Sequence, residues 1–182
     1  MGILRKDIER ILFTKEEIAE KVKDLANQIK REYSDKNPLI LCILKGSLIF
    51  TSDLMRELDF PCEVDFMQVS SYGAGAETTG KLAVKKDLSA NITGRHIIVV
   101  EDILDSGVTL SNLIPELLKR GASSIKLCVL LNKPERRIVE VKADYIGYDI
   151  ENEFVVGYGL DYDEKYRNLP YIGILKREVY EK

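Results

Sequence analysis

Residues 99–110 read Val-Val-Glu-Asp-Ile-Leu-Asp-Ser-Gly-Val-Thr-Leu. With the residues just before it, this stretch begins as the apolar run His96–Val100, which is typical of a strand buried on both faces. Three carboxylates then follow within five residues, and Ser106, Gly107 and Thr109 lead into leucines at helical spacing. The stretch predicts a buried strand, an acidic turn containing glycine, and a helix, in that order.

The chain on either side continues this alternation of apolar runs and helical patterns. We expect helices over residues 14–33, around Phe50–Leu58 and around Leu110–Leu118, and further strands over Leu39–Leu44, Glu63–Val69, Ser124–Leu131, Tyr145–Tyr148, Glu153–Val156 and Tyr171–Leu175. Strands that alternate with helices indicate an α/β fold with a mostly parallel central sheet flanked by helices. We find no linker or repeat, so residues 1–182 are expected to form a single domain with a small flanking lobe.

Two helical segments carry residues that mark their boundaries. Thr14 and Glu17 have the spacing of a capping box, which predicts that the first helix starts there. Pro115 lies inside the third helical pattern, where a proline costs about 3 kcal/mol. We therefore expect a kink at Pro115 or a helix that begins late.

Composition excludes several classes of protein. The chain has 182 residues, 45% of them hydrophobic, and a formal net charge of −3, which gives no general attraction to nucleic acid or anionic membranes. No apolar run approaches the length of about 20 residues that a membrane span needs. The three cysteines lie far apart in apolar runs and are expected to be reduced thiols of a cytoplasmic protein. His96 is the single histidine, which excludes any mechanism that needs two.

The acidic turn has the chemistry of a sugar-phosphate site. Ligands of parallel sheets bind beyond the carboxyl ends of the strands, which is where this turn lies. Adjacent carboxylates raise one another's pKa unless magnesium or sugar hydroxyls compensate. Ser106, Gly107 and Thr109 offer hydroxyls and N–H groups at a helix N-terminus, which suits a phosphate. The alternative interpretation is an acidic strand end followed by an ordinary capped helix.

A second glycine-rich segment invites a different hypothesis. Gly75–Lys81 matches most of the phosphate-binding loop of nucleoside triphosphatases. Leu82 stands where that loop needs Ser or Thr to bind magnesium, and the following residues do not predict a helix. We therefore reject the triphosphatase interpretation.

The stretch Val99–Leu110 resembles the phosphoribosyl diphosphate motif of the type I phosphoribosyltransferases. Other segments resemble the hypoxanthine–guanine branch of that family in the family's order, from about residue 38 to 175. They are the pyrophosphate loop Leu44–Ser47, the mobile lid that opens at Ser71-Tyr72, the purine pocket of Lys133-Pro134 and Phe154–Tyr162, and Tyr166–Pro170.

The resemblance implies a purine salvage reaction. Hypoxanthine or guanine would react with phosphoribosyl diphosphate to give the nucleotide and pyrophosphate. The cofactor would be Mg²⁺, as two ions held mostly through the substrate. Asp105 would be the catalytic base facing N7 of the purine. Lys133 would donate to the 6-oxo group, and Phe154 would stack on the base. Arg167 would meet the pyrophosphate, and the peptide before Lys45 can be cis in this family.

The resemblance also implies a full set of contacts. Phosphoribosyl diphosphate would be bound by Lys45, Gly46, Ser71, Tyr72, Glu101, Asp102, Asp105, Ser106, Gly107, Val108, Thr109 and Arg167. The purine would be bound by Ile103, Lys133, Phe154, Val155 and Asp161, and the metal by Glu101, Asp102 and Asp161. The expected partners are these small molecules and further copies of the chain in a homodimer or homotetramer, with no nucleic acid and no membrane. Two alternatives stay open, a xanthine-preferring transferase and an RNA-binding regulator on the same fold.

Overall fold

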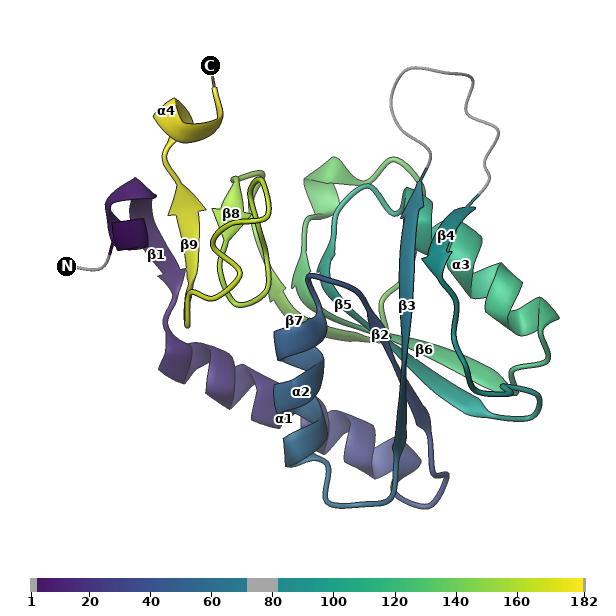
Figure 1. Cartoon of the computed structure of the whole chain (residues 1–182). Helices are drawn as coiled ribbons and strands as arrows, with labels where there is room; N and C mark the ends of the chain where they lie inside the picture. Colours follow the sequence, from purple (N-terminus) through teal and green to yellow (C-terminus); the bar gives the residue numbers. More distant parts are fainter. Residues whose placement is uncertain (1–2, 72–81, 182) are drawn as a thin grey trace.

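The computed structural model describes residues 3–71 and 82–181, and within them it contains two sheets (Figure 1). The larger sheet has six strands in the order β4-β3-β2-β5-β6-β7, and the smaller has three in the order β1-β9-β8. In the larger sheet, β4 alone runs antiparallel to its neighbour. The strands are β1 Ile8–Phe13, β2 Leu39–Ile43, β3 Glu63–Ser71, β4 Leu82–Lys86, β5 His96–Leu104, β6 Ser124–Asn132, β7 Tyr145–Asp149, β8 Val155–Val156 and β9 Ile172–Leu175.

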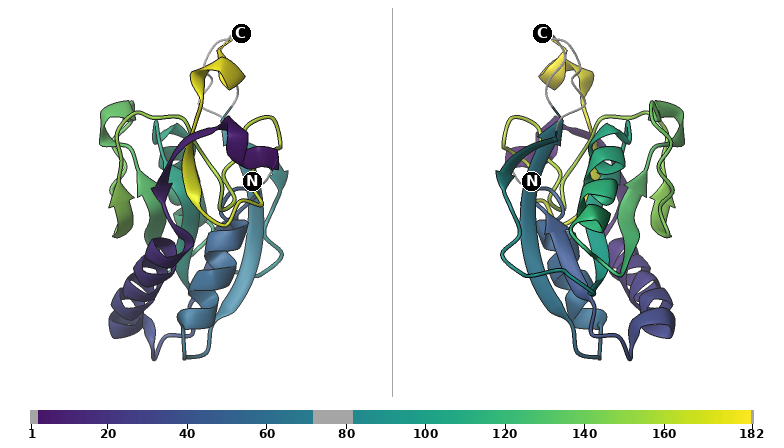
Figure 2. Two further views of the ribbon diagram at one scale, coloured as in Figure 1. Left: turned by 90° about the vertical axis from the view of Figure 1, so that its left-hand side faces the viewer. Right: turned by 90° about the vertical axis from the view of Figure 1, so that its right-hand side faces the viewer.

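Helices cover both faces of the larger sheet (Figure 2). They are α1 Lys15–Tyr33, α2 Leu48–Glu57, α3 Val108–Lys119 and α4 Arg177–Tyr180, with short 3-10 helices at Ile3–Asp7 and Pro134–Arg136. Successive residues of a strand point to opposite faces. Ile98 accordingly packs in the cluster under α1 and α2, and Ile97 packs in the cluster under α3. This double burial explains why the central strands are continuously apolar, and the expected α/β fold is confirmed.

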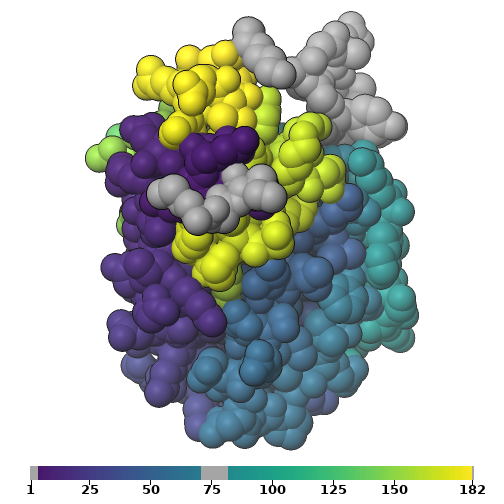
Figure 3. Space-filling model, turned by 60° about the vertical axis from the view of Figure 1, so that its left-hand side comes forward, coloured from purple at the N-terminus to yellow at the C-terminus, as the bar shows by residue number. Residues whose placement is uncertain are grey.

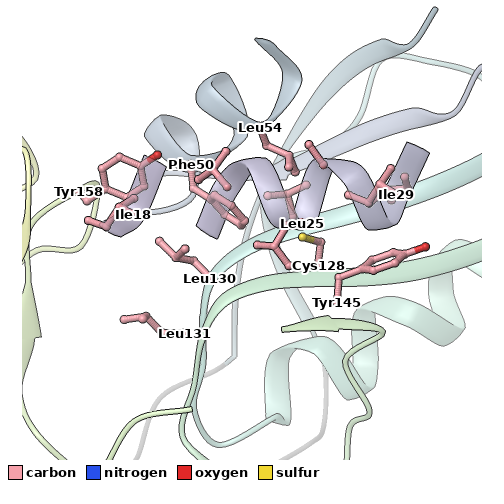
Figure 4. Close-up of a cluster of buried hydrophobic side chains, with 14 of the residues drawn as sticks. Ile18, Leu25, Ile29, Phe50, Leu54, Cys128, Leu130, Leu131, Tyr145 and Tyr158 are labelled. Carbon is pink, nitrogen blue, oxygen red and sulfur yellow. The ribbon is translucent and has the colours of Figure 1, made fainter. Parts of the chain in front are cut away.

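The core between α1, α2 and the sheet is closely packed (Figure 4). Leu25, Ile29, Phe50 and Leu54 are fully buried and contact strand residues such as Leu130. Each such side chain contributes about 1.5–3 kcal/mol relative to an exposed one. This core fixes the sheet whose strand ends carry the candidate site.

Several boundary predictions can now be compared with the structure. The capping box of α1 is present: the Thr14 hydroxyl accepts from the Glu17 N–H, and the Glu17 carboxylate accepts from the Thr14 N–H. Of the two alternatives expected at Pro115, a kink or a late start, the late start is wrong, because α3 begins at Val108 and contains Pro115, and the kink stays a prediction. The predicted end of the central strand at Val100 is also wrong. β5 continues to Leu104 because its last residues still pair with β6.

The three-stranded sheet and residues 157–171, which connect β8 to β9, form the small lobe, called the hood below (Figure 3). β1 lies antiparallel to β9, with Ile8 opposite Leu175, and β8 pairs with the other side of β9. Ile8, Val156 and Leu175 are buried in a cluster of their own. The sequence did not predict β1, whose partner strand lies near the other end of the chain. The hood therefore joins early and late residues beside the carboxyl ends of the sheet.

The states of the cysteines and the lengths of the helices are visible in the structure. All three cysteines are free, with Cys42 and Cys128 buried and Cys62 partly buried. Within the described part of the chain, no helix combines the length and the apolar character that crossing a bilayer requires.

Candidate active site

Two cavities that share lining residues lie at the carboxyl end of β5. The larger, about 480 Å³, is lined by residues of the strand ends and the hood. The smaller, about 160 Å³, is lined by the turn that follows β5 and by the end of β2. Ile103 and Asp105 line both cavities. A ligand with two differently shaped ends could therefore occupy both cavities and cross at these two residues.

The turn between β5 and α3 shapes the smaller cavity. Gly107 has a φ of +82°, and a Cβ there would overlap the backbone oxygen of Val139, so this position requires glycine. The carbonyl of Ser106 accepts hydrogen bonds from the N–H groups of Ile138 and Val139, at 2.9 and 3.1 Å. Val108 and Thr109 open α3, whose first N–H groups lack helical acceptors. The chemistry of this turn, which is fixed in place at a helix N-terminus, suits an anion.

Glu101 and Asp102 lie between the two cavities. Glu101 lines the smaller cavity and Asp102 lines the larger one. Burial and the neighbouring Asp102 carboxylate raise the pKa of Glu101 well above its usual value. Burial also raises the pKa of Asp102, to about 6. The Glu101 Oε2 atom is buried without a hydrogen-bond partner, so this pair suits a ligand that brings hydroxyl groups or a cation.

The larger cavity combines apolar, aromatic and cationic groups. Lys133 is only 8% exposed, and its ammonium donates to the carbonyl oxygen of Glu153 at 2.7 Å. Burial lowers the pKa of Lys133. Phe154 is 37% exposed, and the cavity is also lined by Val155. These side chains offer a flat apolar surface with a cation at one edge, which suits a planar heterocycle bearing an acceptor.

Asp105 receives contacts from two arginines that follow Lys133. Its Oδ1 pairs with Nε of Arg136 at 3.2 Å, and its carbonyl accepts from Nη1 of Arg137 at 2.6 Å. Arg137 also donates to the side chain of Asn132. The Asp105 side chain remains 40% exposed, so it is available to a ligand in either cavity.

A loop of close backbone contacts follows β2. The Leu44–Lys45 peptide is cis. A Cβ on Gly46 would overlap Oδ2 of Asp102, and a Cβ on Gly159 would overlap the carbonyl oxygen of Gly46. The loop, β5 and the hood thus meet in close contact, and at Gly159, where the φ is +104° and the contact is with backbone, only glycine fits.

Arg167 binds groups of the hood in this structure. Its Nη1 donates to the Gly159 carbonyl at 2.8 Å, and its Nη2 pairs with Asp161 Oδ1 at 2.8 Å and Glu164 Oε1 at 3.4 Å. Its Nε is buried without a partner. Asp161 is thus paired with a cation, and among the described residues no three His, Cys, Asp or Glu side chains form a group that could hold a metal.

The structure brings most of the predicted residues together and places further side chains against them. Arg136 and Arg137 contact Asp105, and Tyr180 contacts Phe154, which the sequence did not predict. Glu164 pairs with Arg167, as a cluster of ion pairs near that arginine would have it, and also with Lys45. Arg136 lies three residues beyond Lys133, a spacing that could have pointed to it, whereas Tyr180 carries no local signal. Of the predicted lid, only the backbone of Ser71 is described, at the end of β3. Tyr72 and the near-match Gly75–Lys81 lie outside the described residues.

Comparison with known proteins gives the same family from sequence and from structure. The model of the phosphoribosyl transferase domain matches residues 10–163. A hypoxanthine-guanine phosphoribosyltransferase of Streptococcus thermophilus is 51% identical over 180 residues, covering 99% of this chain and 100% of the relative. The crystal structure of a Staphylococcus aureus hypoxanthine phosphoribosyltransferase has a TM-score of 0.96 and 44% identity, covering 100% of this chain and 98% of that one. The crystal structure of a Bacillus anthracis hypoxanthine-guanine phosphoribosyltransferase has a TM-score of 0.89 and 46% identity, covering 93% of this chain and 99% of that one.

Proposed function

The chain belongs to the phosphoribosyltransferase family, and on that premise we propose that it is a purine salvage enzyme that transfers the 5-phosphoribosyl group of phosphoribosyl diphosphate to N9 of hypoxanthine or guanine. The products are the purine nucleotide and pyrophosphate. The observation that carries the proposal is the pair of cavities that share Ile103 and Asp105. One cavity suits a planar base, the other suits a phosphate, and the ribose that joins them would cross between them.

The purine would occupy the larger cavity. Phe154 would stack on one face of the ring, and Ile103 would pack against it within the same cavity. The Lys133 ammonium would donate to the 6-oxo group, and Val155 would present backbone groups to the purine edge. Adenine carries an amino group where a 6-oxopurine carries an acceptor, so it would leave Lys133 unpaired, and such a site rejects it.

Asp105 would accept the proton that leaves N7 of the purine as N9 bonds to C1′ of the ribose. One of its oxygens is held by Arg136, which leaves the second oxygen free to take a proton at N7. A positioned base of this kind contributes about 10²–10⁴-fold to the rate. The electrons of the breaking C1′–O bond leave with the pyrophosphate.

Phosphoribosyl diphosphate would be bound by groups on three segments. Ser106, Gly107, Val108 and Thr109 would hold the 5′-phosphate at the start of α3. Lys45, with the backbone of Gly46, and Arg167 would face the pyrophosphate and stabilise the negative charge that it gains. The resemblance adds Ser71 and Tyr72 as a lid that excludes water during the reaction.

The carboxylates fit a magnesium-dependent reaction. The unpartnered Oε2 of Glu101 and the raised pKa values of Glu101 and Asp102 indicate a site that is short of positive charge. These two residues would hold the ribose hydroxyls or Mg²⁺, and Asp161 would bind a second ion after releasing Arg167. Bound Mg²⁺ would neutralise charge on the leaving pyrophosphate.

The relatives favour this transferase over the two alternatives. The curated relative at 51% identity is named for hypoxanthine and guanine, which does not favour a xanthine-preferring enzyme or an RNA-binding regulator. We also propose a cytoplasmic enzyme, because three free thiols suit a reducing compartment. The resemblance further implies a homodimer or homotetramer, which light scattering would measure.

The proposal is tested by following nucleotide formation from each base. The purified protein is mixed with magnesium and phosphoribosyl diphosphate, and then with hypoxanthine, guanine, xanthine or adenine. We expect nucleotide from hypoxanthine and guanine and little from adenine. Turnover of adenine as fast as hypoxanthine would refute the role of Lys133, and turnover of no base would refute the transferase.

A further inference from the structure

One carboxylate in the hood holds two cations of the active site. Glu164 Oε2 pairs with the Lys45 ammonium at 2.9 Å, and Glu164 Oε1 pairs with Nη2 of Arg167 at 3.4 Å. Lys45 lies on the loop after β2, 119 residues away in the chain. A single side chain therefore bridges the two segments to which the proposed function assigns the pyrophosphate.

Fold stability gives little reason for this bridge. The side chains of Lys45 and Glu164 are 52% and 64% exposed, and exposed ion pairs contribute about 0–1 kcal/mol. Glu164 also has a φ of +60°, in the left-handed region that is unfavourable for residues with a Cβ. Its N–H donates to Asp161 Oδ2 at 3.0 Å, which holds this turn in place. The backbone conformation thus presents the carboxylate to the two cations.

A carboxylate and a diphosphate cannot both occupy the same cations without repulsion. Lys45 and Arg167 are the cations proposed above to face the pyrophosphate, so the inference rests on the proposed function. A diphosphate carries more negative charge than one carboxylate and can displace it. We propose that Glu164 is a competing counter-anion, which lowers the affinity of the site for phosphoribosyl diphosphate and pyrophosphate and favours the release of pyrophosphate after each turnover.

The same turn provides a matched control. Asp163 is adjacent to Glu164, carries the same charge, and also has a positive φ, of 52°. Asp163 pairs with the Lys165 ammonium at 3.1 Å and not with Lys45 or Arg167. Asp163→Asn and Glu164→Gln therefore remove the same charge from the same turn, but only the second substitution removes the proposed competitor.

The test is the dissociation constant of pyrophosphate, measured by calorimetry in the presence of magnesium. Losing exposed ion contacts of this strength predicts that E164Q binds about threefold to tenfold more tightly than the wild type. We expect D163N to stay close to the wild type. In a Lys45→Ala background, where one of the two cations is absent, the gain from E164Q should shrink. Product inhibition by pyrophosphate should strengthen in E164Q in parallel.

Opposite results would overturn the inference. Weaker binding by E164Q would mean that Glu164 orients Lys45 for the substrate, and an equal gain in D163N would mean a general effect of charge. Unchanged affinity in E164Q would refute the competition but leave the transferase intact. Failure of the folded wild type to bind pyrophosphate at all would refute the proposed function and this inference together.

Discussion

The ring of Phe154 lies stacked on the ring of Tyr180, with centroids 4.7 Å apart and planes 21° from parallel. Both residues line the larger cavity, although Tyr180 comes from the short C-terminal helix α4 and Phe154 from the residue before β8. Tyr162 meets the edge of the same phenyl ring. The ring proposed to stack on the purine is therefore fixed by two other aromatic side chains.

Tyr180→Leu should weaken purine binding by loosening Phe154. An aromatic pair contributes about 0.5–1.5 kcal/mol beyond the area that it buries, so the KM for hypoxanthine should rise about threefold to tenfold. The dissociation constant of phosphoribosyl diphosphate should stay unchanged. Tyr180→Phe keeps the ring and is the control in steady-state kinetics. If it were impaired as much as the leucine variant, the hydroxyl and not the stacking would be responsible.

Asp105→Asn should slow turnover far more than it weakens substrate binding. An amide keeps the shape of the side chain but cannot take the purine proton, so kcat should fall by about a hundredfold or more. Calorimetry with phosphoribosyl diphosphate should give an affinity close to that of the wild type. Equal losses in kcat and affinity would mean that Asp105 only anchors the sugar.

Lys133→Met should erode the selection of 6-oxopurines. Methionine has a similar length but no ammonium, and a hydrogen bond from a charged group is worth about 1.5–3 kcal/mol. The kcat/KM for hypoxanthine should fall about tenfold to hundredfold, with a smaller fall for adenine. Lys126→Met is the control. It removes the same charge nearer the start of β6, from a pair with Asp144, and should leave the ratio of kcat/KM for hypoxanthine to kcat/KM for adenine unchanged.

Glu101→Gln should stabilise the ligand-free protein while it reduces activity. Burial and Asp102 raise the pKa of Glu101 well above its usual value of 4.5. Below about pH 4.5 the Glu101 carboxyl is neutral in both the folded and the unfolded chain, so the substitution adds no free energy of unfolding. At higher pH the unfolded chain releases a proton that the folded chain keeps, so the wild-type free energy of unfolding falls. Thermal unfolding should therefore show a gain in midpoint for Glu101→Gln that grows as the pH rises above about 4.5, with the exposed Glu135→Gln as the control.

Asp65→Ala should destabilise the sheet near β3. Asp65 Oδ2 accepts the N–H groups of Ser89 and Ala90 at 2.6 and 2.8 Å. Burial opposes its ionisation, but hydrogen bonds from Ala90, Phe66 and Ser89 outweigh burial and lower its pKa. Losing the acceptor should cost about 2–4 kcal/mol in urea unfolding at neutral pH. Because the folded pKa is lowered, this stability is present above about pH 4 and is lost as the pH falls further. The exposed Asp59→Ala should change little.

The sequence predicted the parts of the molecule that depend on local pattern. The capping box at Thr14 and the apolar strands follow from periodicity and spacing, and both are present. The acidic turn was located correctly, because residues 101–109 carry their chemistry within one segment. The boundary between β5 and this turn was predicted too early. Glu101 and Asp102 interrupt the apolar run, but the backbone of this segment still pairs with β6.

Features that depend on distant partners could not be predicted in the same way. β1 pairs with β9, and nothing near Ile8 in the sequence indicates Leu175. Tyr180 reaches Phe154, and Glu164 reaches Lys45, only because the hood folds over the strand ends. Arg167 could be predicted in part. Its motif pointed to the site, but its present partners Asp161 and Gly159 are visible only in the structure.

The pairing of Ile8 with Leu175 also bears on synthesis. A ribosome makes β1 before every strand of the large sheet and β9 after all of them, so β1 waits for its partner until the large sheet has been made. The large sheet and its helices need no such delay, because β2 to β7 are complete at Asp149. A chain halted before Ile172 would carry the turn between β5 and α3 but lack the strand that holds β1 and β8 together. The nascent chain would thus complete the hood only after the large sheet.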